Sequence, residues 1–136
     1  MNLDLIKAQS ETITLAYRIA HIVYAETHAR SLRVVEALTS MISNYAKKNN
    51  RNVCDVISDE TIFESLNKNS PRHQDLKTNS NSREFQMCVR VAIRMLHGNL
   101  PDLCYGATMF HRVELLPNWA LARGYIADID GILFYA

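Results

Sequence analysis

The apolar residues in the first part of the sequence recur at helical spacing, and this periodicity constrains the fold more than any other feature of the chain. Between Glu11 and Ala25 they stand three or four positions apart, which places them on one face of a helix. They are Ile13, Ala16, Ile19, Ala20 and Val23. Ser10 precedes them and belongs to a residue type that caps helix N-termini. The sequence therefore predicts a helix that begins after Ser10, buries one face and ends near residues 26–28.

A second helix is predicted to begin after Ser31, which again has the chemistry of an N-cap. Its apolar stripe consists of Val34, Val35, Leu38, Met41, Ile42 and Tyr45. The polar run from Lys47 to Asn52 ends the periodicity, and a short helical turn is expected over Val53–Ile57. The first part of the chain is thus predicted to be helical throughout.

The composition changes between Asn67 and Ser82, where Asn, Ser, Lys and His dominate around Pro71. We expect a long surface loop here, and loops of such length are often functional or mobile. Asn81 and Glu84 then fit a capping box for a third long helix. That helix carries Phe85, Cys88, Val89, Ala92, Ile93 and Leu96 on one side. Gly98, followed by Pro101, is a natural stop.

The last third of the chain has the composition of strands. Cys104–His111 and Ile126–Tyr135 are rich in aromatic and β-branched residues and are interrupted by glycine and proline. We expect two or three short strands with irregular connections. The fold class is therefore predicted to be α+β, with N-terminal helices followed by a small irregular β region, and the length of 136 residues suits a single domain over residues 1–136.

Charge and cysteine content exclude several classes of function. The formal net charge is +1 and the basic residues are scattered, so a nucleic-acid partner is not expected. The three cysteines, Cys54, Cys88 and Cys104, form no Cys-x-x-Cys pair, which argues against a structural zinc site. Cys54 and Cys88 have apolar neighbours and are predicted to be small buried thiols. His21 and His28 flank Glu26 without a His-Glu-x-x-His motif, so neither a metal nor a cofactor is predicted.

No segment of the sequence predicts stable insertion into a membrane. Residues 1–10 are short and polar and lack the apolar core of a signal peptide. No stretch approaches the roughly 18 uninterrupted apolar residues of a membrane span. A target outside the cell would therefore require another export route or a leader that this chain lacks, and the sequence leaves the location and the oligomeric state open.

Several segments, in order, resemble the SleB-type cell wall hydrolases. Ile19–Glu26 is similar to the family helix that ends in Tyr-Gly-Glu or Tyr-Ala-Glu, and Val35–Asn44 is similar to the next helix, which ends in asparagine. Gly106–His111 resembles the family's Gly-Ala-Thr-x-Phe-His, and Pro117–Ala120 resembles its Pro-x-Trp-Ala. The closing Phe-Tyr of the family matches residues 134–135, so the resemblance covers residues 15–135. On these motifs the chain is identified as a divergent member of the family.

The divergence is confined to particular positions. Thr27-His28-Ala29-Arg30 stands where the family has Ala-Arg-Gly-Glu. Tyr45 replaces an arginine, Ile62 replaces a glutamine and Ile132 replaces a histidine. Polar groups that would face a sugar in the family are therefore apolar or aromatic in this chain.

The resemblance implies a lysozyme-like fold and an enzyme that cuts the glycan strands of peptidoglycan without a cofactor. It places the catalytic acid/base on Glu26. The substrate-binding residues that it implies are Tyr24, Asn44, Phe63, Thr108, Phe110, His111 and Trp119. Among these, Phe110 and Trp119 would stack on sugar rings, while Thr108 and His111 would hydrogen-bond to hydroxyl or N-acetyl groups. For each of them, ordinary core packing is the alternative interpretation.

The chemistry requires Glu26 to carry a proton at the pH of the reaction. An exposed glutamate with a pKa near about 4.3 is ionised at neutral pH, whereas burial beside apolar groups raises the pKa. Most glycosidases use two carboxylates, and only Asp128 and Asp130 are weak candidates for the second. The family is similar to lytic transglycosylases, which work with one glutamate. The alternative interpretation of Glu26 is a solvated acid at the end of the helix, where it could pair with Arg30 at i+4.

Two other functions remain possible from the sequence. The chain could be a glycan-binding or assembly module that kept the fold without the activity, as the replaced polar groups at Tyr45, Ile62 and Ile132 suggest. It could also be an unrelated α+β interaction domain. The position of Glu26 relative to Phe110 and Trp119 discriminates between these interpretations.

Overall fold

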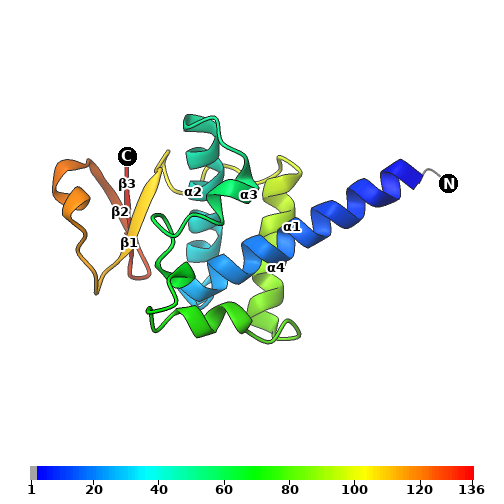
Figure 1. Ribbon diagram of the computed structural model, residues 1–136. Coiled ribbons are helices and arrows are strands. Elements are labelled where there is room, and N and C mark those ends of the chain that lie inside the picture. Colours follow the sequence, from blue (N-terminus) through cyan, green and yellow to red (C-terminus); the bar gives the residue numbers. More distant parts are fainter. Residues whose placement is uncertain (1–2) are drawn as a thin grey trace.

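The computed structural model describes residues 3–136 and has four α-helices followed by a three-stranded sheet (Figure 1). The helices are α1 (Leu3–Thr27), α2 (Leu32–Lys48), α3 (Val53–Val56) and α4 (Arg83–Leu96). Short 3₁₀ helices are η1 (Glu64–Leu66), η2 (His73–Lys77) and η3 (Asn118–Ala122). The strands are β1 (Met109–Arg112), β2 (Tyr125–Ile129) and β3 (Ile132–Tyr135). This arrangement confirms the predicted α+β class.

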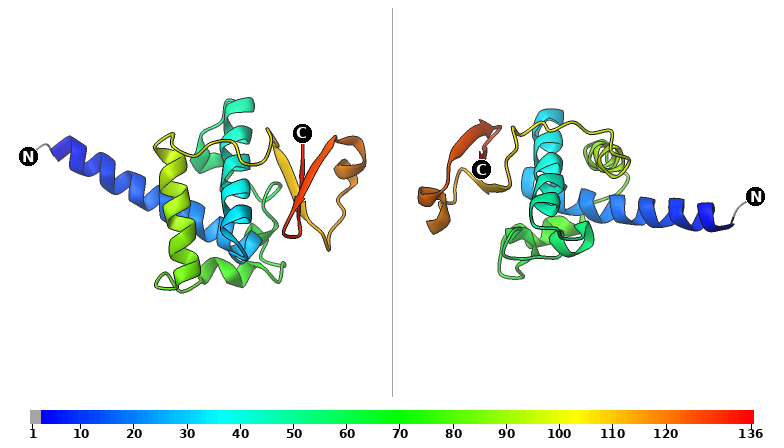
Figure 2. Two further views of the ribbon diagram at one scale, coloured as in Figure 1. Left: turned by 180° about the vertical axis from the view of Figure 1, so that it is seen from behind. Right: turned by 90° about the horizontal axis from the view of Figure 1, so that it is seen from above.

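Helices α1, α2 and α4 pack against one another and bury their apolar stripes together. Ile19, Leu38, Met41 and Phe85 are completely buried where these helices meet. The sheet lies beside α2, and the N-terminal end of α1 projects from the opposite side of the molecule (Figures 1 and 2). None of the helices within residues 3–136 is long and apolar enough to cross a membrane.

Helix α1 begins earlier than the sequence predicted. Ser10 lies inside the helix, and its carbonyl accepts a hydrogen bond from Oγ1 of Thr14 at 3.0 Å. The prediction of Ser10 as an N-cap is therefore wrong. The preceding residues include no glycine or proline, and most of them favour helices, so nothing stops the helix at Ser10.

The turn between α1 and α2 fixes the end of α1 close to where the sequence predicted it. Thr27 donates its hydroxyl to the carbonyl of Val23 at 2.7 Å and accepts the backbone N–H of Ala29 at 3.0 Å. His28 and Ala29 adopt positive φ angles of 54° and 49°, which end the helix. Ser31 then caps α2 by accepting the N–H of Val34 at 3.1 Å, as predicted. Glu26 consequently lies in the last turn of α1.

The predicted loop over residues 67–82 contains a helical segment of its own. Residues 73–77 form η2, which packs against α1. This segment follows η1, and both lie at the C-terminal end of α1 (Figure 1). The predicted loop therefore has regular structure, and it covers the end of the helix that carries Glu26.

Helix α4 is capped by Ser82 instead of the predicted Asn81. Ser82 has extended backbone angles, and its hydroxyl accepts the N–H of Phe85 at 3.1 Å. At the other end, Gly98 has a φ of 73° and donates its N–H to the carbonyl of Met95, so it ends the helix as predicted.

The strands form an antiparallel sheet in the order β1-β3-β2. Asp130 and Gly131 connect β2 and β3 with positive φ angles of 50° and 86°, which suits a two-residue hairpin turn. Strand β1 pairs Phe110 with Phe134 on β3. It begins later than the predicted Cys104, because residues 104–107 form a turn around Gly106, whose φ is 77°.

The cap of α4 provides a test of the helix boundaries. Ser82→Ala should lower the free energy of unfolding by about 1 kcal/mol, since it removes an N-cap acceptor. Asn81→Ala is the matched control and should have a smaller effect, because the Asn81 side chain has no such role. Chemical denaturation followed by circular dichroism measures both. An equal loss in the two variants would contradict the assigned cap.

Candidate active site

A cavity of about 390 Å³ opens where the C-terminal end of α1, the η1 segment, β1 and the chain around η3 meet. Its lining includes four of the residues predicted from the sequence, which are Glu26, Phe110, His111 and Trp119. The remaining lining residues are Glu60, Thr61, Ile62, Glu64, Asn67, Met109, Arg112, Leu115, Leu116 and Pro117. The helical first half and the aromatic tail therefore build one site together.

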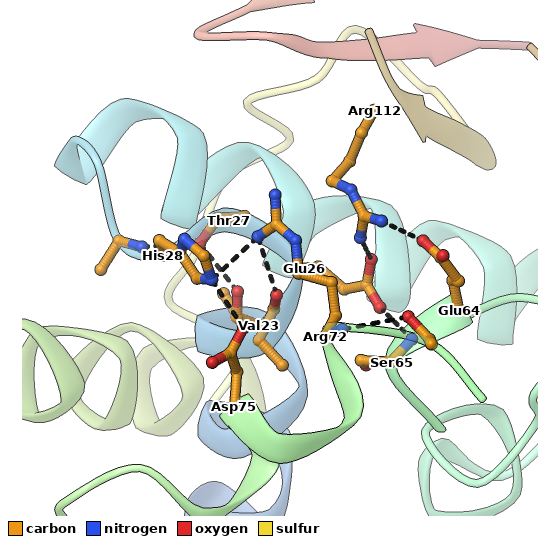
Figure 3. Close-up of polar contacts among 12 residues, drawn as sticks. Val23, Glu26, Thr27, His28, Glu64, Ser65, Arg72, Asp75 and Arg112 are labelled. Atoms are coloured by element: carbon orange, nitrogen blue, oxygen red, sulfur yellow. Dashed lines mark hydrogen bonds and ion pairs between the residues drawn. The ribbon is translucent and has the colours of Figure 1, made fainter. Parts of the chain in front are cut away.

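Glu26 is buried in the wall of this cavity. The residue is 2% exposed, and both carboxylate oxygens have partners within the protein. Oε2 accepts the backbone N–H of Ser65 in η1 at 2.9 Å, and Oε1 accepts a hydrogen bond from Nη1 of Arg112 on β1 at 3.0 Å (Figure 3). The i+4 pairing with Arg30 does not form, since Arg30 is directed to the carbonyl of Asp130 at 3.5 Å.

The surroundings of Glu26 act on its pKa in opposite directions. Burial is the largest effect and raises the pKa above its ordinary value. The hydrogen bonds from Ser65 and the positive charge of Arg112 lower it, while the negative charge of Glu64 raises it. The balance is a raised pKa, which is the direction that a general acid needs.

Arg112 connects Glu26 to two further acids. Its Nη2 pairs with Oε2 of Glu64, and its Nε donates to Oε1 of Glu114 at 3.2 Å. The Arg112 side chain is only 7% exposed, whereas that of Glu64 is 34% exposed. Figure 3 shows the guanidinium between the carboxylates of Glu26 and Glu64.

Neither of the two weak candidates for a second carboxylate lines the cavity. Asp128 and Asp130 lie at the β2–β3 turn, where Asp128 accepts the N–H of Gly131 and Asp130 pairs with the hydroxyl of Ser31. Glu60 and Glu64 line the cavity instead. Neither belongs to a recognisable motif, and the contact of Glu64 with Arg112 spans 48 positions, so no local pattern could have revealed it.

The aromatic wall of the cavity is held by contacts among the strands and η3. The rings of Trp119 and Tyr135 meet edge to face at 5.2 Å, and His111 stacks on Tyr135 at 5.3 Å. Nδ1 of His111 lies 2.8 Å from the carbonyl of Arg112, and Nε2 lies 2.8 Å from the hydroxyl of Tyr135. Since a carbonyl only accepts, Nδ1 carries the proton, and the ring is fixed in orientation.

The other predicted substrate-binding residues do not line this cavity. Asn44 donates to the carbonyl of Ala107 at 3.1 Å and so holds the turn before β1. Phe63 is fully buried and packs behind Phe110, with ring centroids 5.7 Å apart. Thr108 is buried, and Tyr24 is half-buried next to His28. Phe63 thus packs against a residue of the cavity wall, and contact with a substrate remains a prediction for all four residues.

A polar network continues from the cavity to the outer surface. Arg72 pairs with Glu114 at 3.3 Å and also donates to the carbonyl of Ala25 at 3.2 Å. His28 lies between Arg72 and Asp75, with its Nε2 2.9 Å and 2.8 Å from them, respectively (Figure 3). The loop over residues 67–82 thereby anchors the end of α1 close to Glu26.

The cysteines lie outside the cavity. Burial raises the pKa of the Cys88 and Cys104 thiols to about 12, so they are poor nucleophiles. Cys88 is buried as predicted, whereas Cys54 is only half-buried, which corrects the prediction for that residue. Among the residues that the structure describes, no three histidine, cysteine or acidic side chains gather as ligands for a metal ion.

Comparison with known proteins gives one match. The sequence profile of the cell wall hydrolase family matches residues 34–135, from the first turn of α2 to the end of β3. No curated protein and no solved structure matches the chain. The matched range includes the cavity residues of the η1 segment, β1 and η3, whereas Glu26 precedes it. Because the profile covers most of the sequence and agrees with the motifs, the chain belongs to the SleB-type cell wall hydrolase family.

Proposed function

We propose that this protein cleaves the glycan strands of peptidoglycan between N-acetylmuramic acid and N-acetylglucosamine, with Glu26 as the general acid and base. The observation that carries the proposal is the burial of Glu26 in the wall of a cavity that Phe110 and Trp119 also line. Membership of the cell wall hydrolase family supports peptidoglycan as the substrate. The role of Glu26 depends on the geometry, since this residue lies outside the range that the family profile matches.

The first step would transfer the proton of Glu26 to the glycosidic oxygen. As the bond breaks, the sugar that is left gains positive charge, which a carboxylate nearby stabilises. In a transglycosylase, the Glu26 carboxylate would then take the proton of the muramic C6 hydroxyl, and a 1,6-anhydro ring would close without water. In a muramidase, a second carboxylate would assist the attack of water. Glu26 is the only buried glutamate among the residues whose burial is described, which favours the first route, whereas Glu64 keeps the second open.

Aromatic side chains in the cavity would orient the glycan. A pyranose ring presents C–H groups on its face, and Trp119 and Phe110 offer apolar surface for such contacts. Leu115 and Leu116, at the same cavity, are 40% and 69% exposed and would extend this surface along the strand. The apolar wall also excludes water from Glu26, which strengthens the electrostatic interactions of the reacting groups.

A second candidate function is glycan binding without catalysis. It is favoured by the two hydrogen bonds that occupy both oxygens of Glu26, because a general acid must present its proton to the substrate. Binding would use the same cavity and the same aromatic wall. It differs from the enzymatic proposal in that wild-type protein would retain wall fragments without changing them.

Digestion of purified peptidoglycan tests the enzymatic proposal. Wild-type protein should release soluble muropeptides, and Glu26→Gln should lower the rate by about 10²-fold to 10⁴-fold, as expected for loss of a general acid. Glu36→Gln is the matched control, since Glu36 is an ion-paired glutamate that does not line the cavity. Mass spectrometry of the products separates the two mechanisms, because anhydro ends indicate transglycosylation and reducing ends indicate hydrolysis.

The same assay distinguishes the second candidate. If wild-type protein binds wall fragments, leaves them intact and binds them equally well after Glu26→Gln, the domain is a binding module. Turnover that is unaffected by Glu26→Gln would refute the assignment of the catalytic residue.

The pH dependence of the activity follows from the raised pKa of Glu26. The acid form is required in the first step, so the rate should fall as the pH rises through the pKa of Glu26. This fall should occur at a higher pH than about 4.3, the ordinary value for glutamate. Initial rates between acidic and neutral pH measure it, and a fall centred at the ordinary value would contradict the effect of burial.

The pH dependence of the free energy of unfolding should reveal the raised pKa of Glu26 without any substrate. Above the ordinary pKa of glutamate, native Glu26 holds its proton while the unfolded chain has released it. The native state therefore binds more protons, and the contribution of Glu26 to the free energy of unfolding decreases as the pH rises to the native pKa. Glu26→Gln should abolish this part of the slope. An unchanged slope in urea denaturation would show that burial does not raise the pKa.

A further inference from the structure

Arg112 lines the cavity and pairs with three acids, although the sequence analysis did not single it out. Each of its three guanidinium nitrogens pairs with a different acid. Nη1 donates to Glu26, Nη2 donates to Glu64 and Nε donates to Glu114. The three acids come from α1, from η1 and from the segment after β1, so one side chain joins three elements.

We propose that Arg112 is a positioning residue, which holds the carboxylates of Glu26 and Glu64 at fixed places in the cavity wall through one guanidinium. This inference rests on the proposed function of Glu26. It adds a residue that acts through the catalytic acid, and it names Glu64 as the second carboxylate of the site.

The shape of the guanidinium explains why an arginine would serve here. Its donors form a rigid planar fork, so two carboxylates paired with Nη1 and Nη2 are fixed relative to each other. A lysine would supply the charge as a single point without that geometry. The Arg112 side chain is 7% exposed and all three of its guanidinium nitrogens are paired with acids, so we expect it to act on the substrate through them.

The two carboxylates differ in their surroundings. Glu26 is almost completely buried and also receives the N–H of Ser65, whereas the side chain of Glu64 is 34% exposed. Burial raises the pKa of Glu26, which makes it the acid of the pair that is suited to hold a proton. We infer that Glu26 is the proton donor and that Glu64 supplies negative charge to the cavity.

The charges that face Glu26 predict opposite effects for the two partners. Arg112 lowers the pKa of Glu26 and Glu64 raises it. Glu114 and Arg72 are farther along the same network and pair with each other at 3.3 Å. His111 also lines the cavity, but both of its ring nitrogens are directed to other partners. Removal of Arg112 and removal of Glu64 should therefore shift the titration of Glu26 in opposite directions.

Carbon-13 NMR of protein labelled at the glutamate side-chain carboxyl tests this prediction. The spectrum of Glu26→Gln identifies the Glu26 signal, which is then followed as a function of pH in each variant. Arg112→Gln should move the midpoint upward by about one pH unit or more, because an opposite charge at this distance lowers a carboxyl pKa by roughly 1–3 units. Glu64→Gln should move it downward.

Two further variants keep the test specific. Arg94→Gln removes an arginine ion pair with Glu36 outside the cavity and should leave the Glu26 midpoint unchanged. Arg112→Lys retains the charge but not the fork, so the midpoint should stay near the wild-type value while kcat falls at an unchanged KM. If Arg112→Gln does not fold, the downward shift in Glu64→Gln still tests whether the charges of this network act on the titration of Glu26.

The outcomes separate this inference from the proposed function. Shifts of equal sign in Arg112→Gln and Glu64→Gln, or no shift in either, would overturn the role of the bridge. If the two variants show opposite shifts but the wild-type protein never cleaves peptidoglycan, the enzymatic proposal is refuted and the role of the bridge stands. A full rate in Arg112→Lys would show that charge alone is sufficient and would refute positioning by the fork.

Discussion

The ion pair between Glu26 and Arg112 is the interaction on which the site depends. The two residues are 86 positions apart, and their 3.0 Å contact joins the end of the first helix to the first strand of the sheet. Both side chains are almost completely buried, and without Arg112 the Glu26 carboxylate would keep only the N–H of Ser65 as a partner. Breaking such a pair by removal of one partner typically costs about 3–5 kcal/mol. The cavity therefore keeps its shape only while the helical and β parts of the chain remain together.

Burial has a second consequence, which is chemical. Exclusion of water makes the protonated form of Glu26 easier to maintain, and the same exclusion makes the attraction of Arg112 stronger. These two effects oppose each other, and Glu64 shifts the balance because it shares the positive charge of Arg112. Burial remains the largest effect on the pKa of Glu26, and the charge of Glu64 raises this pKa further. Burial and the charge of Glu64 thus act in the same direction, against the hydrogen bonds of Ser65 and the charge of Arg112.

The elements of the fold followed from local patterns, while the site required contacts that no local pattern contains. Apolar periodicity predicted α2 and α4, and Ser31 and Gly98 marked ends that the structure confirms. Ser10 was misleading, because a serine caps a helix only where the backbone before it leaves the helical conformation. Glu26, Phe110 and Trp119 were predicted from motifs and do line one cavity. Arg112 and Glu64 were missed, because their importance arises only from the way distant segments meet.

The position of Arg112 also bears on the residues in which this chain departs from its family. Ile62, which replaces a glutamine, lines the cavity and removes a hydrogen-bonding group from its wall. Arg30 stands where the family has a second glutamate, and it is directed away from Glu26 toward Asp130. In the described structure, the acid that accompanies Glu26 comes instead from η1, and it is held there by the arginine that follows the Phe-His pair of β1. The charges that act on Glu26 thus come from segments other than the helix that carries it.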